Sequence, residues 1–306
     1  MKKKIYLSNF SGLGNRLESL VIAFLIADRW GHSIYLHWPE KDSLRVAGAG
    51  RGRIMPWERI GSLKLRDFEA PTLAALGEPR IISLRSTYGP RELQRAFVLP
   101  TAARLSVDPS IAAAIRDAFS RRAGRPAVAV HLRQGDFHVA AERYDATAVR
   151  HPAPGVWWYE HVMREYARAH PSVYFVIGYS GDAETLRHLQ REFDIVTLPA
   201  VFGYRSLLPG HVSEGHPVVD LFGLACCTTL LATPTSSFSH WAANALGPQT
   251  RAILPPPQTT RERPEWRVAE LRGSVALDWR DAAERGIGTR AAGALPAPAP
   301  PVTDWL

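Results

Sequence analysis

Residues 127–132 (AVAVHL) are apolar at every position except His131. A strand without polar alternation is buried on both faces, which is typical of parallel sheets covered by helices. Short apolar runs and stretches of helical spacing alternate along the chain after it. We expect helices near 156–169, 183–193, 217–227 and 240–246, and strands over 173–179, 195–198 and 228–232. This order predicts an α/β protein.

A first series of the same kind precedes this one. We expect strands over 4–8, 33–37 and 81–84, a helix that ends at Gly31, and a helix from Pro109 to Arg122. Residues 40–75 show little periodicity and predict loops and short helices. The series restarts near residue 126, and 306 residues are enough for two domains. We therefore expect one domain over 1–124, a second over 125–287, and a loose Pro/Ala-rich tail over 288–306.

Composition excludes several classes of protein. Apolar residues make up 46% and charged residues 22%, which are globular rather than disordered values. The longest apolar run, 21–27, is far shorter than the roughly 20 residues of a membrane span, and the N-terminus lacks a secretory pattern. Cys226 and Cys227 are adjacent and cannot build a disulfide framework. A cytoplasmic protein of a reducing compartment is expected.

The net charge of +8 is concentrated in the first part of the chain. Residues 1–126 hold 21 basic and 11 acidic side chains, whereas residues 127–246 hold 8 and 11. A basic segment could meet nucleic acid, an anionic membrane surface or an acidic substrate, or it could reflect an Arg-rich composition alone.

The segment GLGNR at 12–16 lies between the first expected strand and helix. Glycines there let the backbone approach a ligand closely, and the helix N-terminus favours anions. The segment is not a dinucleotide fingerprint, because Leu17 replaces the third glycine. It is not a phosphate loop, because Gly-Lys-Ser/Thr is missing. A plain turn explains it about as well.

The segment HLRQGD at 131–136 ends the buried strand, where open α/β sheets bind ligands. Alternation places His131 and Arg133 on one side and Leu132 on the other. Arg133 then either neutralises a phosphate, which suits its planar donor fork, or pairs internally with Asp136. The position at a strand end favours the phosphate.

The segment SSFS at 236–239 opens the helix after the strand over 228–232. Serines are common helix caps, and hydroxyls with free N–H groups at a helix start also make a phosphate cradle. Capping alone would explain the segment. Taken with Arg133 one strand earlier, it favours a phosphate site.

Together, GLGNR at 12–16, HLRQGD at 131–136 and Asp220 followed by SSFSHWAANAL at 236–246 resemble the motifs of the fucosyltransferase superfamily. This superfamily includes bacterial α-1,2-, nodulation, α-1,6- and protein O-fucosyltransferases. The resemblance implies a GT-B-like fold in which two Rossmann-type domains face a central cleft. It also implies an inverting, metal-independent transfer from GDP-fucose, bound chiefly by the second domain, with no cofactor.

The same resemblance implies the residues of the donor site. Arg133 matches the arginine that contacts the donor β-phosphate and assists departure of GDP, and His131 matches a donor-site histidine. Asp182 and Asp220 match acidic residues that hold guanine or shape its pocket, since a carboxylate can accept from the N1–H and N2–H₂ groups of guanine. The other implied donor contacts are Gly14, Asn15, Arg16, Ser236, Ser237, Phe238 and Ser239.

The chain departs from the family pattern at two positions. Gln134 stands where many relatives carry a second arginine, and Ala141 stands where the α-1,6 branch carries a glutamate base. Glu142 is one residue away from that position. Glu142, Asp136 and Glu18 are all candidates for the base, and the residues alone do not order them.

Other functions fit the same residues. One is transfer from another nucleotide sugar, and another is a non-catalytic module that binds acidic glycans or nucleic acid. Because the basic segment lacks the aromatic interleaving of nucleic-acid binders, no nucleic-acid partner is expected. The expected acceptor is a glycan or a lipid-linked glycan, with the basic first domain at the inner face of a membrane. Trp38, Trp57 and Tyr88 could stack on sugar rings or join the core.

Overall fold

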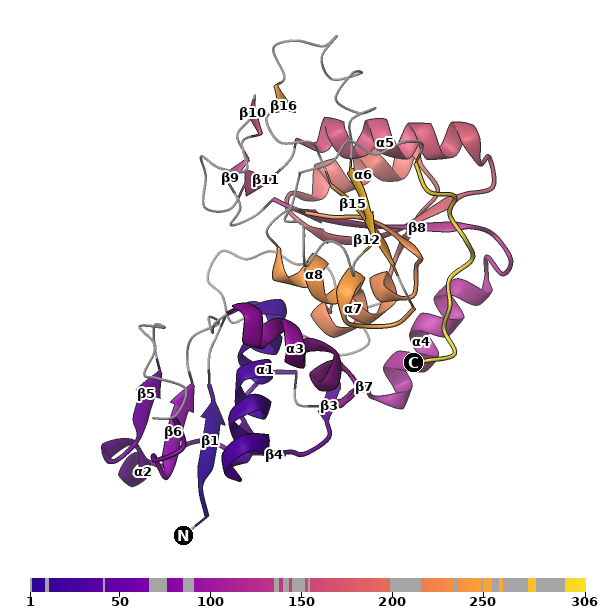
Figure 1. Cartoon of the computed structure of the whole chain (residues 1–306). Helices are drawn as coiled ribbons and strands as arrows, with labels where there is room; N and C mark the ends of the chain where they lie inside the picture. Colours follow the sequence, from indigo (N-terminus) through magenta and orange to yellow (C-terminus); the bar gives the residue numbers. More distant parts are fainter. Residues whose placement is uncertain are drawn as a thin grey trace. The chain divides into compact units, whose positions relative to one another are not determined.

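The computed structural model describes residues 2–8, 11–40, 42–65, 76–84, 91–134, 138–139, 143–144, 152–153, 155–198, 216–233, 236–248, 250–254, 259–260, 275–278 and 295–306. The chain divides into two compact units, Met1–Asp108 and Pro109–Leu306 (Figure 1). No helix in these ranges is both long enough and apolar enough to span a bilayer.

Unit 1 is built on a parallel sheet in the order β4-β2-β1-β6-β5. Its strands are β1 (Lys4–Leu7), β2 (Ser33–Leu36), β4 (Ala49–Arg51), β5 (Leu63–Leu65) and β6 (Ile81–Leu84). Its helices are α1 (Leu13–Trp30), α2 (Pro56–Ile60) and α3 (Arg91–Ala102), and β3 (Leu44–Val46) pairs with β7 (Leu105–Val107).

Helix α1 links β1 to β2 and ends where the sequence predicts. Leu17, Leu20 and Phe24 of its apolar face are buried. Gly31 caps it with a φ of 72°, in the left-handed region that favours glycine. The expectation of only loops and short helices over 40–75 is wrong for the described part, because β4 and β5 join the sheet there. Strands of three residues are too short to show a period of two.

Unit 2 contains a sheet in the order β13-β12-β8-β14-β15-β17, parallel except for the β15·β17 pair. Its strands are β8 (Ala127–Arg133), β12 (Tyr174–Ser180), β13 (Ile195–Thr197), β14 (Thr229–Leu231), β15 (Arg251–Leu254) and β17 (Val275–Asp278). The helices are α4 (Pro109–Ser120), α5 (Val156–Ala169), α6 (Ala183–Glu192), α7 (Pro217–Ala225) and α8 (Ser237–Asn244). Two small ribbons pair β9 (His138–Val139) with β11 (Pro152–Ala153) and β10 (Arg143–Tyr144) with β16 (Thr259–Thr260). Two units with parallel sheets confirm the expected α/β fold class.

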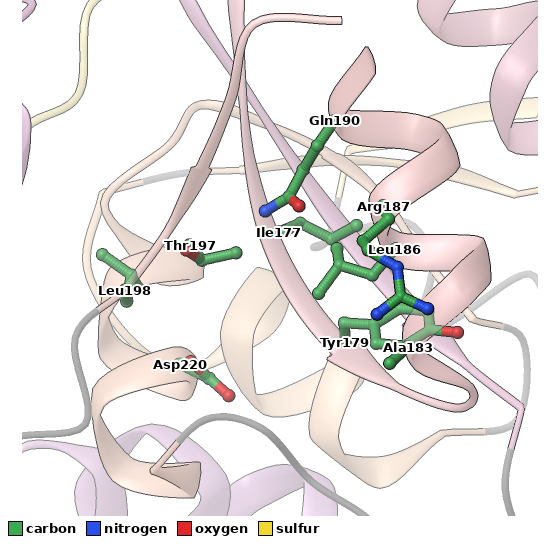
Figure 2. A pocket seen from close by; sticks show the side chains of 9 residues that line it. All are labelled: Ile177, Tyr179, Ala183, Leu186, Arg187, Gln190, Thr197, Leu198 and Asp220. Atoms are coloured by element: carbon green, nitrogen blue, oxygen red, sulfur yellow. The ribbon is translucent and has the colours of Figure 1, made fainter. Parts of the chain in front are cut away.

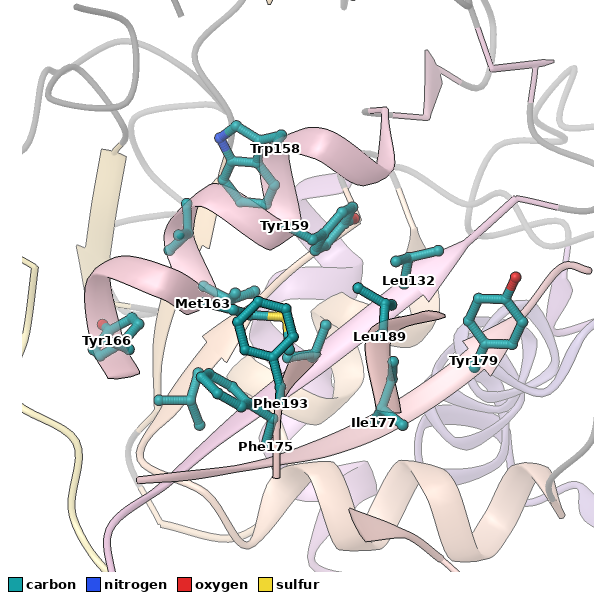
Figure 3. Packing of buried hydrophobic residues seen from close by; sticks show 14 of the residues in the cluster. Leu132, Trp158, Tyr159, Met163, Tyr166, Phe175, Ile177, Tyr179, Leu189 and Phe193 are labelled. Carbon is teal, nitrogen blue, oxygen red and sulfur yellow. The ribbon is translucent and has the colours of Figure 1, made fainter. Parts of the chain in front are cut away.

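The central strands of unit 2 are covered on both faces, as the apolar run 127–132 predicts. One face packs on α5 and α6, with Leu132, Phe175 and Ile177 contributed by the strands (Figure 3). From α5, Trp158 and Met163 fill the space above them. On the other face, helix α7 packs on β12 and β8.

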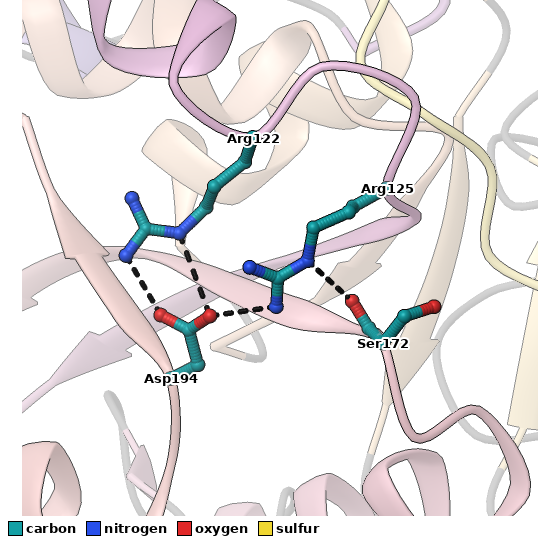
Figure 4. A network of polar contacts seen from close by, with 4 residues as sticks. All are labelled: Arg122, Arg125, Ser172 and Asp194. Carbon is teal, nitrogen blue, oxygen red and sulfur yellow. Dashed lines mark hydrogen bonds and ion pairs between the residues drawn. The ribbon is translucent and has the colours of Figure 1, made fainter.

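Helix α4 belongs to the second unit, although the sequence places the domain boundary at 124/125. It packs on α7. The chain after it is fixed by Asp194, whose carboxylate accepts from Arg122 and Arg125, each at 2.7 Å (Figure 4). Arg125 also donates to the Ser172 carbonyl at 2.9 Å. The units therefore divide before α4, between Asp108 and Pro109.

The expectation of a loose tail is wrong for residues 295–306; residues 288–294 lie outside the described ranges. The Ala127 N–H donates to the Ala299 carbonyl at 3.0 Å, and the Val302 N–H donates to the Cys226 carbonyl at 2.8 Å. The Trp305 ring stacks on Phe222 with a centroid distance of 5.6 Å. A proline-rich segment lacks many donors, but its carbonyls can still accept hydrogen bonds, here from the first residue of the central strand β8.

Replacing Trp305 by alanine is expected to destabilise unit 2, because the aromatic contact with Phe222 is lost. A loss of about 1–2 kcal/mol is expected for such a half-buried ring, which corresponds to a fall in Tm of about 2–8 °C. Thermal unfolding followed by circular dichroism measures it. The exposed neighbour Asp304→Ala is the matched control; equal Tm values for the two variants would contradict a packed segment.

Candidate functional site

Polar groups of unit 2 converge at the carboxyl edge of its sheet. Strands β8 and β12 end side by side, with Arg133 paired in register with Ser180. Helices α6, α7 and α8 all begin at this edge, capped by Asp182, His216 and Ser236. The free N–H groups and dipoles of helix starts favour anions, so this edge suits a negatively charged ligand.

His131 connects β8 to the start of α8. Its Nδ1 atom lies 2.7 Å from the Ser239 hydroxyl, and its ring stacks on Phe238 at a centroid distance of 4.8 Å. Leu132 points into the opposite face and packs in the α5 core. The predicted alternation along the strand is therefore confirmed for these two residues.

The Ser239 hydroxyl joins His131 to the segment before α8. Its oxygen accepts from the Thr233 N–H at 3.1 Å and lies within hydrogen-bonding distance of Nδ1 of His131. Donation from Ser239 to Nδ1 corresponds to the tautomer in which Nε2 carries the ring proton. Burial and the positive charge of Arg133 lower the pKa of His131 to about 3, so the imidazole is neutral at pH 7.

Thr233, which the sequence analysis missed, joins β8 to the segment before α8. Its hydroxyl donates to the His131 carbonyl at 2.7 Å and accepts from the Arg133 N–H at 3.3 Å. The Tyr159 hydroxyl lies 3.1 Å from the same oxygen. A threonine before a proline reads as an ordinary turn residue, so only its full burial in the folded unit reveals this role.

Arg133 and the SSFS segment lie at the same edge, as predicted. Arg133 is the last residue of β8 and is half-buried. In α8, Ser236 caps the helix by accepting from the Ser239 N–H at 3.4 Å, and Ser237 and Phe238 are half-buried in its first turn. Capping and ligand binding are compatible, because the cap uses only one of the free N–H groups of the helix start.

A pocket of about 230 Å³ lies at the edge strand β13, between α6 and α7 (Figure 2). Asp220 of α7 lines one side, and Arg187 and Gln190 of α6 line the other. The Asp220 side chain is 7% exposed, and burial raises its pKa to about 8. The remaining lining residues are Ile177, Tyr179, Ala183, Leu186, Thr197 and Leu198.

Asp182, the other acidic residue expected near guanine, does not line this pocket. It is exposed and caps α6, accepting from the Thr185 N–H and hydroxyl, each at 2.8 Å. These hydrogen bonds hold the pKa of its carboxyl below the ordinary value. Its backbone carbonyl accepts from the Tyr179 hydroxyl at 2.6 Å. Of the two acidic residues, Asp220 is therefore the stronger candidate for contact with a nucleobase such as guanine.

Gln134 also contributes to this edge. Its N–H donates to the Ser180 carbonyl at 2.7 Å, and its side chain accepts from the Tyr179 hydroxyl at 3.2 Å. A Cβ atom on Gly181 would lie 2.5 Å from that hydroxyl and 2.7 Å from the Gln134 Oε1 atom. The glycine therefore leaves room for Tyr179 to reach both Gln134 and Asp182.

The GLGNR residues belong to unit 1, at the start of α1. Gly14 is buried and Asn15 half-buried. Arg16 is 3% exposed and forms a buried ion pair with Glu40, with its guanidinium 5.9 Å from the centre of the Trp38 ring. A buried arginine needs such a partner. The predicted donor contacts of these residues stay predictions.

Two predicted catalytic residues, Asp136 and Glu142, lie outside the described residues, as does Ala141. Glu18, the third candidate base, is on α1 of unit 1. Of the aromatic residues considered for sugar stacking, Trp38 is buried in the core, Trp57 is exposed, and Tyr88 lies outside the described residues. Within the described ranges, no cluster of three or more His, Cys, Asp or Glu side chains is placed to hold a metal ion.

No family model and no curated protein sequence matches the chain. Solved structures do match it. Fucosyltransferase NodZ from Bradyrhizobium has 16% identity and a TM-score of 0.52, over 83% of this chain and 95% of that one. POFUT1 in complex with GDP has 11% identity and a TM-score of 0.53, over 82% of this chain and 97% of that one. An Arabidopsis thaliana FUT1 mutant in complex with GDP has 11% identity and a TM-score of 0.55, over 84% of this chain and 71% of that one. The chain has the fold of these fucosyltransferases, which confirms the expected resemblance at the level of the fold.

The raised pKa of Asp220 predicts a pH dependence of stability. Because the folded state holds this proton more tightly than the unfolded chain, the contribution is complete below about pH 4 and is lost as pH rises towards 8. Asp220→Asn cannot titrate, so its Tm relative to the parent protein should increase between pH 5 and pH 8. Thermal scans across this range measure the difference. The exposed Asp182→Asn is the control, and a constant difference for Asp220→Asn would contradict a buried neutral carboxyl.

Proposed function

We propose that the chain is an inverting, metal-independent glycosyltransferase that transfers fucose from GDP-fucose to a hydroxyl of a glycan acceptor. The observation that carries this proposal is that Arg133 and the start of α8 lie at the carboxyl edge of the same sheet, which also holds a pocket with the buried carboxyl of Asp220. The fold supports it, since fucosyltransferase structures with this fold were obtained with GDP or GDP-fucose.

The diphosphate of the donor would lie at the carboxyl edge of the second sheet. Arg133 would supply a planar fork of donors to it, and the N–H groups at the start of α8 would supply further hydrogen bonds. His131 is neutral, so its Nε2–H would donate without adding a second positive charge beside Arg133. Donation from the Ser239 hydroxyl to Nδ1 would hold the ring in that tautomer.

The transfer itself would form one bond and break one. The acceptor oxygen bonds to the anomeric carbon while the bond from that carbon to the β-phosphate oxygen breaks, and GDP leaves with the electron pair. Arg133 and the α8 start stabilise the charge that develops on the leaving diphosphate. The acceptor proton passes to a base, for which Asp136, Glu142 and Glu18 are the candidates.

Guanine would occupy the pocket beside Asp220. An ionised carboxylate accepts from both N1–H and N2–H₂ of guanine, whereas uracil and cytosine do not present this pair of donors. The low dielectric of the pocket strengthens such a paired hydrogen bond. Asp220 of α7 would thus select the nucleotide of the donor. Arg133 of β8 and the start of α8 would stabilise the diphosphate as it leaves.

The remaining parts of the proposal concern partners and place. The acceptor would be a glycan or a lipid-linked glycan, the protein would act in the cytoplasm at the inner face of a membrane, and neither a cofactor nor nucleic acid would take part. Residues 1–126, with their excess of basic side chains, favour an anionic acceptor or surface.

Arg133→Ala is expected to lower the rate of sugar transfer by on the order of 10²–10³, because a donor that stabilises the leaving diphosphate is removed. The rate of GDP release from GDP-fucose with a glycan acceptor measures this. Arg168→Ala, an exposed arginine of α5, is the matched control. The Tm of both variants should stay close to that of the parent protein; full activity of a folded Arg133→Ala variant would overturn the proposed role.

GDP is expected to raise the Tm more than UDP, TDP or CMP does, because only guanine pairs with the Asp220 carboxylate. This pairing requires ionised Asp220, so GDP affinity should rise with pH up to about 8 and then level off. The rise would be up to about tenfold per pH unit. Asp220→Asn should lose both the preference for GDP and this dependence. A parent protein that prefers UDP would instead support transfer from another nucleotide sugar.

A further inference from the structure

Helix α2 of unit 1 presents two large apolar side chains to solvent. Trp57 is 67% exposed and Ile60 is 90% exposed. They are three residues apart and therefore lie on the same side of the helix. Single exposed apolar residues are ordinary, but an adjacent aromatic and aliphatic pair on one helical turn forms a patch that favours contact with an apolar phase.

The opposite side of α2 is anchored in unit 1. Glu58 is 8% exposed and accepts from the Lys4 ammonium at 2.8 Å, the Tyr6 hydroxyl at 2.9 Å and the Met55 N–H at 3.1 Å. The bond from Lys4 holds the pKa of Glu58 below its ordinary value. The turn that carries Trp57 and Ile60 is therefore fixed to the sheet, beside β5 and β6 (Figure 1).

Exposed basic side chains lie on α2 and on segments next to it in unit 1. Arg59 lies on α2 itself, and Lys64 lies on β5, the strand that follows. The Lys4 N–H donates to the Arg80 carbonyl at 2.8 Å, which places exposed Arg80 beside the anchor of α2. The carboxylate of α2, Glu58, points inward and is neutralised by Lys4. The exposed residues of α2 thus include two apolar side chains and one arginine, and Lys64 and Arg80 add positive charge on neighbouring segments.

We propose that α2 and the basic side chains around it form a docking surface for an anionic lipid bilayer. The indole of Trp57 suits the headgroup level of a membrane, Ile60 suits the acyl boundary below it, and Arg59, Lys64 and Arg80 suit lipid phosphates. A bilayer fits better than a soluble anionic glycan, because an aliphatic side chain as exposed as Ile60 offers a sugar neither a hydrogen bond nor a ring to stack on. The surface deepens the membrane placement in the proposed function, whereas the chemistry of sugar transfer does not depend on it.

Vesicle sedimentation of the full chain tests the surface. The protein should bind vesicles of phosphatidylcholine mixed with phosphatidylglycerol more tightly than vesicles of phosphatidylcholine alone, and added salt should weaken the binding. Trp57→Ser and Ile60→Ser should each weaken it by about tenfold, since each removes one inserted apolar side chain. Lys64→Glu should also weaken vesicle binding, because it replaces a positive charge by a negative charge that anionic lipids repel.

Matched controls separate the patch from general hydrophobicity and charge. Leu99→Ser changes an apolar residue of the same unit that is 47% exposed, and Arg168→Glu changes an exposed arginine of unit 2. Both should bind vesicles as the parent protein does. Equal binding by the parent protein and by folded Trp57→Ser and Ile60→Ser variants would overturn the proposal.

Quenching of tryptophan fluorescence by brominated lipids gives a second measurement. Quenching is expected in the parent protein, and Trp57→Phe should reduce it while leaving most of the vesicle binding intact. A soluble sulfated polysaccharide provides the remaining comparison. If it binds as tightly as the anionic vesicles do, and brominated lipids do not quench, the surface is a polyanion site and the bilayer proposal fails.

Discussion

The burial of β8 on both faces is the constraint on which the second unit depends. A strand enclosed by α5 and α6 on one face and by α7 on the other has no place for a polar side chain along most of its length. Its polar residues must lie at the carboxyl end, where His131 and Arg133 meet the starts of helices. The same packing that makes the core therefore also places the charged group at the edge where helix dipoles favour anions.

Burial at this edge also decides which groups carry charge. His131 loses its proton and Asp220 keeps its own at neutral pH, so both are neutral in the folded chain. Arg133 adds a guanidinium group to the same edge. A ligand that binds the ionised form of Asp220 would release its proton, and this would couple ligand recognition to pH.

Much of the second unit can be read from its sequence, because its strands are long or strongly apolar. The extent of α5 follows from its helical periodicity, and the end of α1 follows from Gly31. The short strands β4 (AGR) and β5 (LKL) could not be predicted, because neither lies in a continuous apolar run as the equally short β13 and β14 do. Thr233 could not be predicted, because its contacts join segments about a hundred residues apart. The family motif is enough to identify Asp220 as a candidate for the guanine contact. That Asp182 is exposed and caps α6 is seen only in the folded unit.

The segment 295–306 has a consequence for biosynthesis. It packs on Ala127, Cys226 and Phe222, each of which precedes its contact in the segment by 76 residues or more. During translation these partners leave the ribosome first, and the nascent unit must wait for its last contacts. Until the segment emerges, the ring of Phe222 lacks its stacking partner and the start of β8 at Ala127 lacks its bridge.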